Sequence, residues 1–107
     1  MSKSIIINKT GGPEVLEISD VKVGRPGPTE IKVKNIAIGL NYIDTYHRSG
    51  LYPVDLPSGI GLEAAGVVEE IGVDVKDFNI GDNVAYASPP LGAYSELRII
   101  SEKVLVK

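Results

Sequence analysis

The 107-residue sequence contains no cysteine and no tryptophan, and it has a single histidine. Without cysteine, the chain forms neither disulfides nor thiolate metal sites. A single histidine also excludes a zinc or copper centre built from several histidines of one chain. The composition therefore predicts a protein with no bound metal, whose stability comes from an apolar core.

Long apolar runs and clusters of positive charge are also missing. No segment approaches the length of a membrane span, and the apolar run Ile5–Ile7 is too short and too soon followed by polar residues for a secretory signal. Eleven Lys and Arg against fourteen Asp and Glu give a net charge of −3. Nucleic-acid binding requires clustered positive charge. We expect a cytoplasmic protein with no membrane and no nucleic-acid partner.

Glycine and proline are abundant, with 12 and 7 residues respectively. Their frequency favours a turn-rich β fold over a helical bundle. Short apolar segments bounded by turn residues predict six or seven strands in one domain, arranged as a β-barrel or sandwich. These predicted strands cover residues 5–7, 15–23, 30–38, 64–72, 83–86, 93–100 and 104–106.

The clearest alternation of apolar and polar residues lies in the segment 30–38. Ile31 and Val33 share one face, and Lys32 and Lys34 share the other, which is typical of a strand with one buried face. After Asn35 the apolar phase shifts. This shift predicts a β-bulge or passage into a strand buried on both sides.

One short helix is predicted between Asn41 and Gly50. Asn41 suits the N-cap, and Asp44 stands three residues later, as in a capping box with the shorter acid. His47 and Arg48 fall in the last turn, and Gly50 suits the position after the helix. Two turns are marginal alone, so tertiary packing must hold this helix in place.

Residues 59–64 match the dinucleotide-binding pattern Gly-x-Gly-x-x-Ala. That pattern needs a buried strand before it and a helix after it. Here residues 51–58 contain two prolines, and the residues that follow are rich in β-branched side chains. We therefore interpret Gly59 and Gly61 as positions of tight turning and close backbone approach rather than as a phosphate cradle.

Three kinds of polar or aromatic side chain remain as candidates for function. His47 is interpreted as a cap or surface group rather than a general base. Glu63 lies among apolar residues and glycines, which favours a structural hydrogen-bond acceptor over an acid or base of raised pKa. Tyr42, Tyr46 and Tyr52 either pack together at the edge of the core or form the wall of a pocket for a planar ligand.

Six segments of the sequence occur together, in this order, in a known family: Gly11–Leu16, Ala37–Tyr46, Arg48–Tyr52, Gly61–Val68, Gly81–Val84 and Gly92–Tyr94. Through them the chain resembles the NADPH:quinone oxidoreductases of the zeta-crystallin type, a zinc-free branch of the medium-chain dehydrogenases. The resemblance covers essentially the whole chain.

This resemblance implies that residues 1–107 form the N-terminal GroES-like domain, a partial β-barrel with short helices. It implies NADPH as the cofactor and a quinone as the substrate. The quinone pocket would be lined by Tyr46 and Tyr52. The residues implied to lie against the nicotinamide end of the cofactor are Asn41, Tyr42, Ile43, Asp44, Thr45 and Tyr46.

The same resemblance argues against a metal in the reaction. Zinc-dependent relatives have a cysteine near the start of the Asn41 segment and a histidine in the middle of a Gly-His-Glu motif. Here that motif reads Gly61-Leu62-Glu63, and the chain has no cysteine. Without a Lewis acid, the acceptor must need little carbonyl polarisation, and quinones meet this requirement because their reduction gives a stabilised aromatic product.

Members of that family are much longer, because a Rossmann domain follows this segment. The present sequence stops at Lys107, before any such βαβ pattern. We therefore expect that the chain alone does not turn over NADPH and that a second chain carries the Rossmann domain. An uncovered apolar patch or sheet edge would favour a homo-oligomer. The alternatives are a non-catalytic β-barrel interaction module and an inactive remnant of a split gene.

Overall fold

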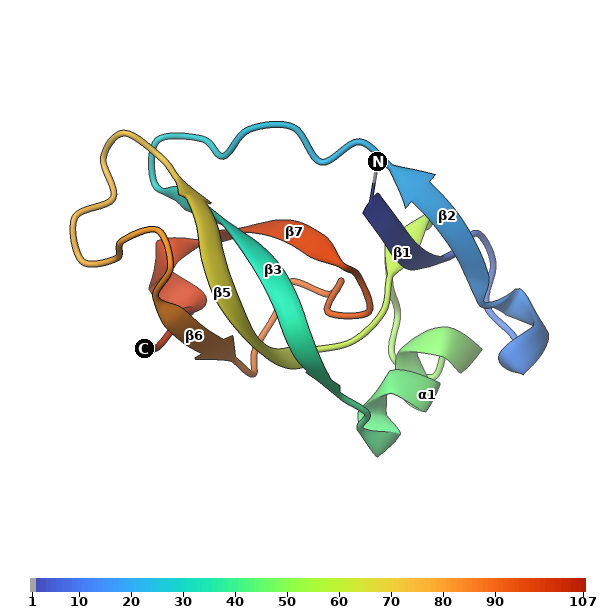
Figure 1. Ribbon diagram of the computed structural model, residues 1–107. Helices are drawn as coiled ribbons and strands as arrows, with labels where there is room; N and C mark the ends of the chain where they lie inside the picture. The colour runs from blue at the N-terminus through green and yellow to red at the C-terminus, as the bar shows by residue number, and fades with distance from the viewer. Residues whose placement is uncertain (1) are drawn as a thin grey trace.

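The computed structural model describes residues 2–107, and within that range the chain forms two antiparallel sheets and one α-helix (Figure 1). The first sheet has the order β2-β1-β4, with β1 (Ser2–Ile7), β2 (Glu17–Val21) and β4 (Ser58–Gly59). The second has the order β6-β5-β3-β7, with β3 (Glu30–Gly39), β5 (Glu63–Ile71), β6 (Asn83–Tyr86) and β7 (Leu97–Ser101). The remaining elements are helix α1 (Tyr42–Ser49) and the 3-10 turns η1 (Pro13–Val15) and η2 (Glu102–Val104).

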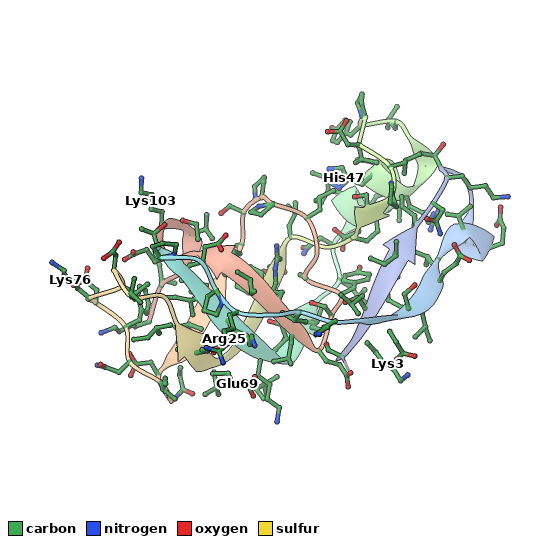
Figure 2. All side chains as sticks on the ribbon, turned by 90° about the horizontal axis from the view of Figure 1, so that it is seen from above. Lys3, Arg25, His47, Glu69, Lys76 and Lys103 are labelled. Atoms are coloured by element: carbon green, nitrogen blue, oxygen red, sulfur yellow. The ribbon has the colours of Figure 1, made fainter. Side chains whose placement is uncertain are left out.

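The predicted mainly β fold class is confirmed, and the two sheets lie at opposite ends of an elongated molecule. Its principal extents are 40 × 25 × 21 Å. Figure 1 shows the second sheet at one end, and β1, β2 and α1 at the other. Figure 2 shows His47 of α1 far from Lys76 and Lys103. Helix α1 directly follows the C-terminal end of β3, so the course of β3 determines where the helix begins.

Strand β3 shows both the predicted alternation and the predicted bulge. Ile31 and Val33 are fully buried, whereas Lys34 is exposed. Its register with β5 shifts between Asn35 and Ala37, and again between Lys32 and Val33. Pairing with β7 ends at Lys34. Beyond that point, β3 pairs with β5 on one side and leaves its other edge without a paired strand.

The core is divided between the two ends of the molecule. The larger cluster lies on the second sheet, and it includes Val68 of β5, Ile100 of β7 and Phe78 from the β5–β6 connection. A smaller cluster of Ile7, Val15 and Ile60 lies beneath the first sheet. Burial of these side chains supplies the main driving force for the fold.

Three of the predicted strands are corrected. The strand predicted over 15–23 forms only as β2, Glu17–Val21, because Val15 belongs to η1. The strand predicted over 93–100 begins at Leu97, because residues 93–96 bond instead to β1 and to the segment before β5. The strand predicted over 104–106 does not form, because η2 extends to Val104 and only an isolated bridge between Ala85 and Val106 follows it. The two-residue strand β4 was not predicted, because residues 51–58 contain prolines and read as a loop.

Residues 92–96, which we call the connector, join the two sheets. The Ile5 N–H donates to the Tyr94 carbonyl at 2.8 Å, and the Glu96 N–H donates to the Lys3 carbonyl at 2.9 Å. From the second sheet, the Asn35 amide donates to the carbonyls of Ala93 and Ser95 at 3.2 and 3.0 Å.

The Asn35 side chain is fully engaged at this junction. Its Oδ1 accepts a hydrogen bond from the Tyr86 hydroxyl at 2.9 Å. Gly66 pairs opposite Asn35, and a Cβ added there would collide with the Lys34 carbonyl oxygen. The absence of a side chain at Gly66 therefore lets β5 approach β3 where the bulge forms.

We predict that Asn35→Ala destabilises the chain by roughly 2–3 kcal/mol, because it leaves the Tyr86 hydroxyl and two connector carbonyls without their partner. Chemical denaturation followed by circular dichroism measures this loss. Lys34→Ala, at the exposed neighbouring position, should change the free energy of unfolding by less than about 0.5 kcal/mol. Equal losses in the two variants would contradict this role for Asn35.

Candidate functional site

Helix α1 begins and ends at the predicted residues. Asn41 has extended backbone angles, and its N–H donates to Asp44 Oδ2 at 3.1 Å, as expected for a capping box. Gly50 ends the helix with φ +89°, a left-handed conformation that favours glycine. An added Cβ at Gly50 would also lie 3.2 Å from Thr10. These caps fix the position of a helix too short to be stable alone.

Two hollows flank α1. The first, which we call the Asn41 hollow, has a volume of about 400 Å³. The second, which we call the proline hollow, has a volume of about 690 Å³. The Asn41 hollow is lined by Leu16, Leu40, Asn41, Tyr42, Asp44, Thr45, Arg48, Ile60 and Tyr94. The proline hollow is lined by Ile43, His47, Pro53, Val54, Asp55, Pro57, Ser58, Gly59, Leu62, Pro89, Pro90 and Leu91.

Of the six residues predicted to face a cofactor, five divide between these hollows, and Tyr46 lines neither. Four of them, Asn41, Tyr42, Asp44 and Thr45, line the Asn41 hollow. Ile43 points to the other side of the helix and lines the proline hollow. The segment therefore lines more than one surface, as the 3.6-residue repeat of a helix requires.

Asn41 is held by a residue of β5 as well as by its own helix. Its Nδ2 donates to Glu63 Oε1 at 2.8 Å. The Glu63 side chain lies over Gly39, where an added Cβ would collide with the carboxylate. This contact confirms the interpretation of Glu63 as a structural hydrogen-bond acceptor.

Asp44 and Tyr94 form a contact that the sequence did not predict. Asp44 is 5% exposed, and its Oδ2 accepts a hydrogen bond from the Tyr94 hydroxyl at 2.5 Å. Its Oδ1 is buried and has no hydrogen-bond partner among residues 2–107. Burial, this hydrogen bond and the Asp44 charge raise the pKa of Tyr94 above its ordinary value.

The two glycines of the dinucleotide-like pattern make close approaches to the connector. Gly61 has φ +100°, and an ideal Cβ there would lie 2.5 Å from the Tyr94 ring. Gly59 faces Gly92, whose Cα would lie 2.9 Å from such an atom. Strand β5, and not a helix, begins at Glu63. The interpretation of these glycines as sites of close backbone approach is therefore confirmed.

Three tyrosines lie together at α1: Tyr42 and Tyr46 belong to the helix, and Tyr52 follows it. The Tyr42 and Tyr46 ring centroids are 5.5 Å apart, and those of Tyr46 and Tyr52 are 5.2 Å apart. His47 extends this group, with its ring 6.0 Å from that of Tyr52. Tyr42 and Tyr52 are 78% and 46% exposed, so both rings are accessible to a ligand.

The sequence did not indicate the proline hollow. Its walls come from α1, the segment before β5 and the β6–β7 connection. His47 contributes to these walls, and its Nδ1 is buried with no hydrogen-bond partner among the described residues. Only the three-dimensional fold brings these segments together. The proline pairs of the two loops were the available signal, but they identify turns and not a shared surface.

Two kinds of feature are absent from residues 2–107. They contain no group of three or more His, Asp or Glu side chains arranged to hold a metal ion. They also contain no helix that is long and apolar enough to cross a membrane. The Asn41 hollow offers amide, carboxylate, hydroxyl and guanidinium groups together with aromatic and aliphatic side chains. The group beside it consists of tyrosine rings.

The raised pKa of Tyr94 predicts a specific pH dependence of stability. The folded chain keeps a proton that the unfolded chain releases above pH 10.0. This contribution to the free energy of unfolding is complete below that pH and is lost as the pH rises above it. We expect the unmodified chain to lose more stability than Tyr94→Phe between about pH 9 and about pH 11. Denaturation curves that change in parallel would contradict the prediction.

Comparison with known proteins shows which family the chain resembles in sequence. Residues 27–107 match the alcohol dehydrogenase GroES-like domain. The chain is 58% identical to the quinone oxidoreductase of Pseudomonas aeruginosa over 99% of its length and 33% of that protein. It is 50% identical to quinone oxidoreductase 1 of Escherichia coli, over 99% of this chain and 33% of the relative.

Solved structures agree with these matches. The quinone oxidoreductase of Pseudomonas syringae has a TM-score of 0.96 and 56% identity, covering 100% of this chain and 33% of that one. The Escherichia coli quinone oxidoreductase complexed with NADPH has a TM-score of 0.94 and 48% identity, covering 97% of this chain and 32% of that one. The chain thus spans about a third of the length of these relatives. It belongs to the family of alcohol dehydrogenase GroES-like domains, in the form found in quinone oxidoreductases.

Proposed function

We propose that the chain is the catalytic-domain portion of an NADPH-dependent quinone oxidoreductase that transfers hydride without zinc. The observation that carries this proposal is the arrangement around α1, with a hollow of apolar walls and a few polar side chains on one side and paired tyrosine rings beside it. The similarity to quinone oxidoreductases over the whole chain, including one complexed with NADPH, supports it. Because those relatives are three times as long, the nucleotide-binding part is proposed to lie in further polypeptide.

The Asn41 hollow fits the nicotinamide end of such a cofactor. The carboxamide of nicotinamide carries two N–H donors and one carbonyl acceptor. The Asn41 side chain supplies both a donor and an acceptor, and Leu16, Leu40 and Ile60 supply apolar walls. When bound, the cofactor would supply the hydride. The chain's own residues would bind and orient its ring.

Tyr46 and Tyr52 are proposed to hold the acceptor. Their edge-to-face arrangement gives a planar ring two aromatic surfaces, and their hydroxyl groups can donate to quinone oxygens. A hydride from the cofactor and a proton from solvent convert the quinone into its hydroquinone. Leu62 stands at the position that is histidine in zinc-dependent relatives, so the tyrosines would act by positioning instead of by metal polarisation.

An exposed apolar face supports contact with further polypeptide. Ile18, Ile38 and Leu40 are 71%, 42% and 81% exposed. They lie near the part of β3 that β7 does not pair with, and a hollow of about 470 Å³ lies between Ile18, Leu40 and the connector. Such faces mark interaction sites in soluble proteins. We propose that a chain carrying a Rossmann domain covers this apolar face. In the absence of that chain, the face is proposed to join two copies of the present chain.

The activity test compares the 107-residue chain with a chimera in which it replaces the first third of the Pseudomonas aeruginosa relative. NADPH oxidation with a benzoquinone or naphthoquinone is followed at steady state. We expect turnover by the chimera and none by the chain alone. A folded but inactive chimera would reject the proposed function, and turnover by the chain alone would reject the need for a second part.

Variants of the chimera test the acceptor site. Tyr46→Ala and Tyr52→Ala should each lower kcat/KM for the quinone about tenfold, the loss expected for an aromatic contact. Tyr86→Phe removes a hydroxyl from a tyrosine of the second sheet, and it should leave kcat/KM unchanged. If the three variants behave alike, the paired tyrosines are not the acceptor site.

The proposed self-association is measured by light scattering of the isolated chain over a range of concentrations. We expect a dimer or larger species, and we expect Ile38→Lys to shift the population towards monomer. Val73→Lys changes an apolar residue that is 89% exposed at a distant loop, and it serves as the matched control. A monomer at high concentration would rule out the exposed face as a self-association surface.

A further inference from the structure

The first turn of α1 is tied to the connector by the hydrogen bond between Tyr94 and Asp44. This bond joins residues 50 positions apart in the sequence. Asp44 is the only charged residue of α1 that is buried, and Tyr94 separates the Asn41 hollow from the hollow beside Ile18. The contact therefore lies in the wall of the proposed cofactor site, although the sequence pattern assigned no role to Tyr94.

The Asp44 carboxylate supports Asn41 through the same oxygen. Oδ2 accepts the Asn41 N–H as well as the Tyr94 hydroxyl. On its other side, the Asn41 amide donates to Glu63. Asn41 is thus held between a helix cap and a strand. Its orientation depends on where the Asp44 carboxylate lies.

Tyr94 is itself fixed by contacts that leave its ring little freedom. Its N–H donates to the Ile60 carbonyl at 3.0 Å, and its carbonyl accepts from Ile5. The ring lies against Gly61, where any side chain would collide with it. The Tyr94 hydroxyl is therefore presented to Asp44 by a rigid support, as expected of a group that positions another.

Asp44 has no cation to balance its charge within salt-bridge distance among residues 2–107. Arg48, one turn later, donates instead to the Gly11 carbonyl at 3.2 Å. A buried carboxylate is costly unless it is hydrogen-bonded. The contacts to Tyr94 and Asn41 offset this cost. They make the carboxylate part of the support rather than a free ligand-binding group.

We propose that Asp44 and Tyr94 are positioning residues, whose hydrogen bond sets the placement of Asn41 in the Asn41 hollow. This inference rests on the proposed function, in which that hollow takes the nicotinamide end of the cofactor. It changes the role of Asp44 from direct cofactor contact to support, and it adds Tyr94 to the site.

The test uses the full 107-residue chain and reduced nicotinamide mononucleotide, the half of the cofactor that carries the reactive ring. Ligand affinity is measured by NMR titration for Tyr94→Phe, Asp44→Ala and Asp44→Asn. Tyr94→Phe keeps the ring packing and removes the hydrogen bond. We expect Tyr94→Phe and Asp44→Ala to weaken binding about tenfold, the effect of losing a hydrogen bond to a charged group.

Asp44→Asn and Tyr86→Phe separate positioning from stability. In Asp44→Asn the amide oxygen of the new side chain still accepts from Tyr94 and Asn41, so this variant should bind within about threefold of the unmodified chain. Tyr86→Phe loses a comparable tyrosine hydrogen bond, the one to Asn35. We expect it to lower the unfolding midpoint without changing affinity.

Hydrogen exchange gives a second readout of positioning. In Tyr94→Phe, the backbone amide hydrogen of Asn41 should exchange faster with solvent, while the backbone amide hydrogen of Val33 should stay protected.

Three outcomes overturn the inference, and they differ from one another. If Tyr94→Phe loses stability but not affinity, the hydrogen bond is merely structural. If Asp44→Asn binds as weakly as Asp44→Ala, the carboxylate contacts the ligand directly. If the unmodified chain does not bind the mononucleotide, the proposed cofactor hollow fails together with the inference that rests on it.

Discussion

The side-chain amide of Asn35 is the contact on which the rest of the molecule depends. It joins Tyr86 of β6 to the connector, and the connector is hydrogen-bonded in turn to β1. Each sheet is too small to be stable alone, because a sheet of three or four short strands needs another layer to cover its apolar face. The Asn35 amide therefore joins two sheets of low individual stability into one folded unit. It does so at the point where β3 changes register.

That change of register links the core to the site. Up to Lys34, β3 belongs to a regular sheet between β5 and β7. Past the bulge, it leaves β7 and carries the chain to Asn41, where the cap of α1 begins. The helix then separates the two hollows. The positions of Asn41 and of the helix that follows are thus set by the β-bulge in β3, and Gly66 allows that bulge to form.

Local patterns were sufficient for much of this structure. The alternation at Ile31 and Val33 predicted the buried face of β3, and the phase change after Asn35 predicted the bulge. The caps Asn41, Asp44 and Gly50 predicted the helix to within one residue, because capping chemistry acts between near neighbours. The resemblance carried by the ordered motifs led to the GroES-like fold that the comparisons confirm.

The features that were not predicted depend on partners distant in the sequence. Residues 93–96 look like a strand, but their hydrogen bonds go to Lys3, Ile5 and Ile60, which no local pattern indicates. The proline hollow and the Asp44–Tyr94 pair are likewise made only when remote segments meet. Strand propensity reports whether a residue suits a pleated surface, and it does not report which strand will pair with it.

The pairing of the first strand with the connector has a consequence for biosynthesis. A ribosome makes β1 before the connector, and the connector partners of Lys3 and Ile5 emerge only after some ninety further residues. The last residue of helix α1 is Ser49, but the hydrogen bond from Tyr94 to Asp44 forms only after the connector has been made. A helix of two turns is only marginally stable without such tertiary contacts. The junction between the two sheets and the packing of α1 are therefore completed only after the connector has been translated, through contacts between residues far apart in the sequence.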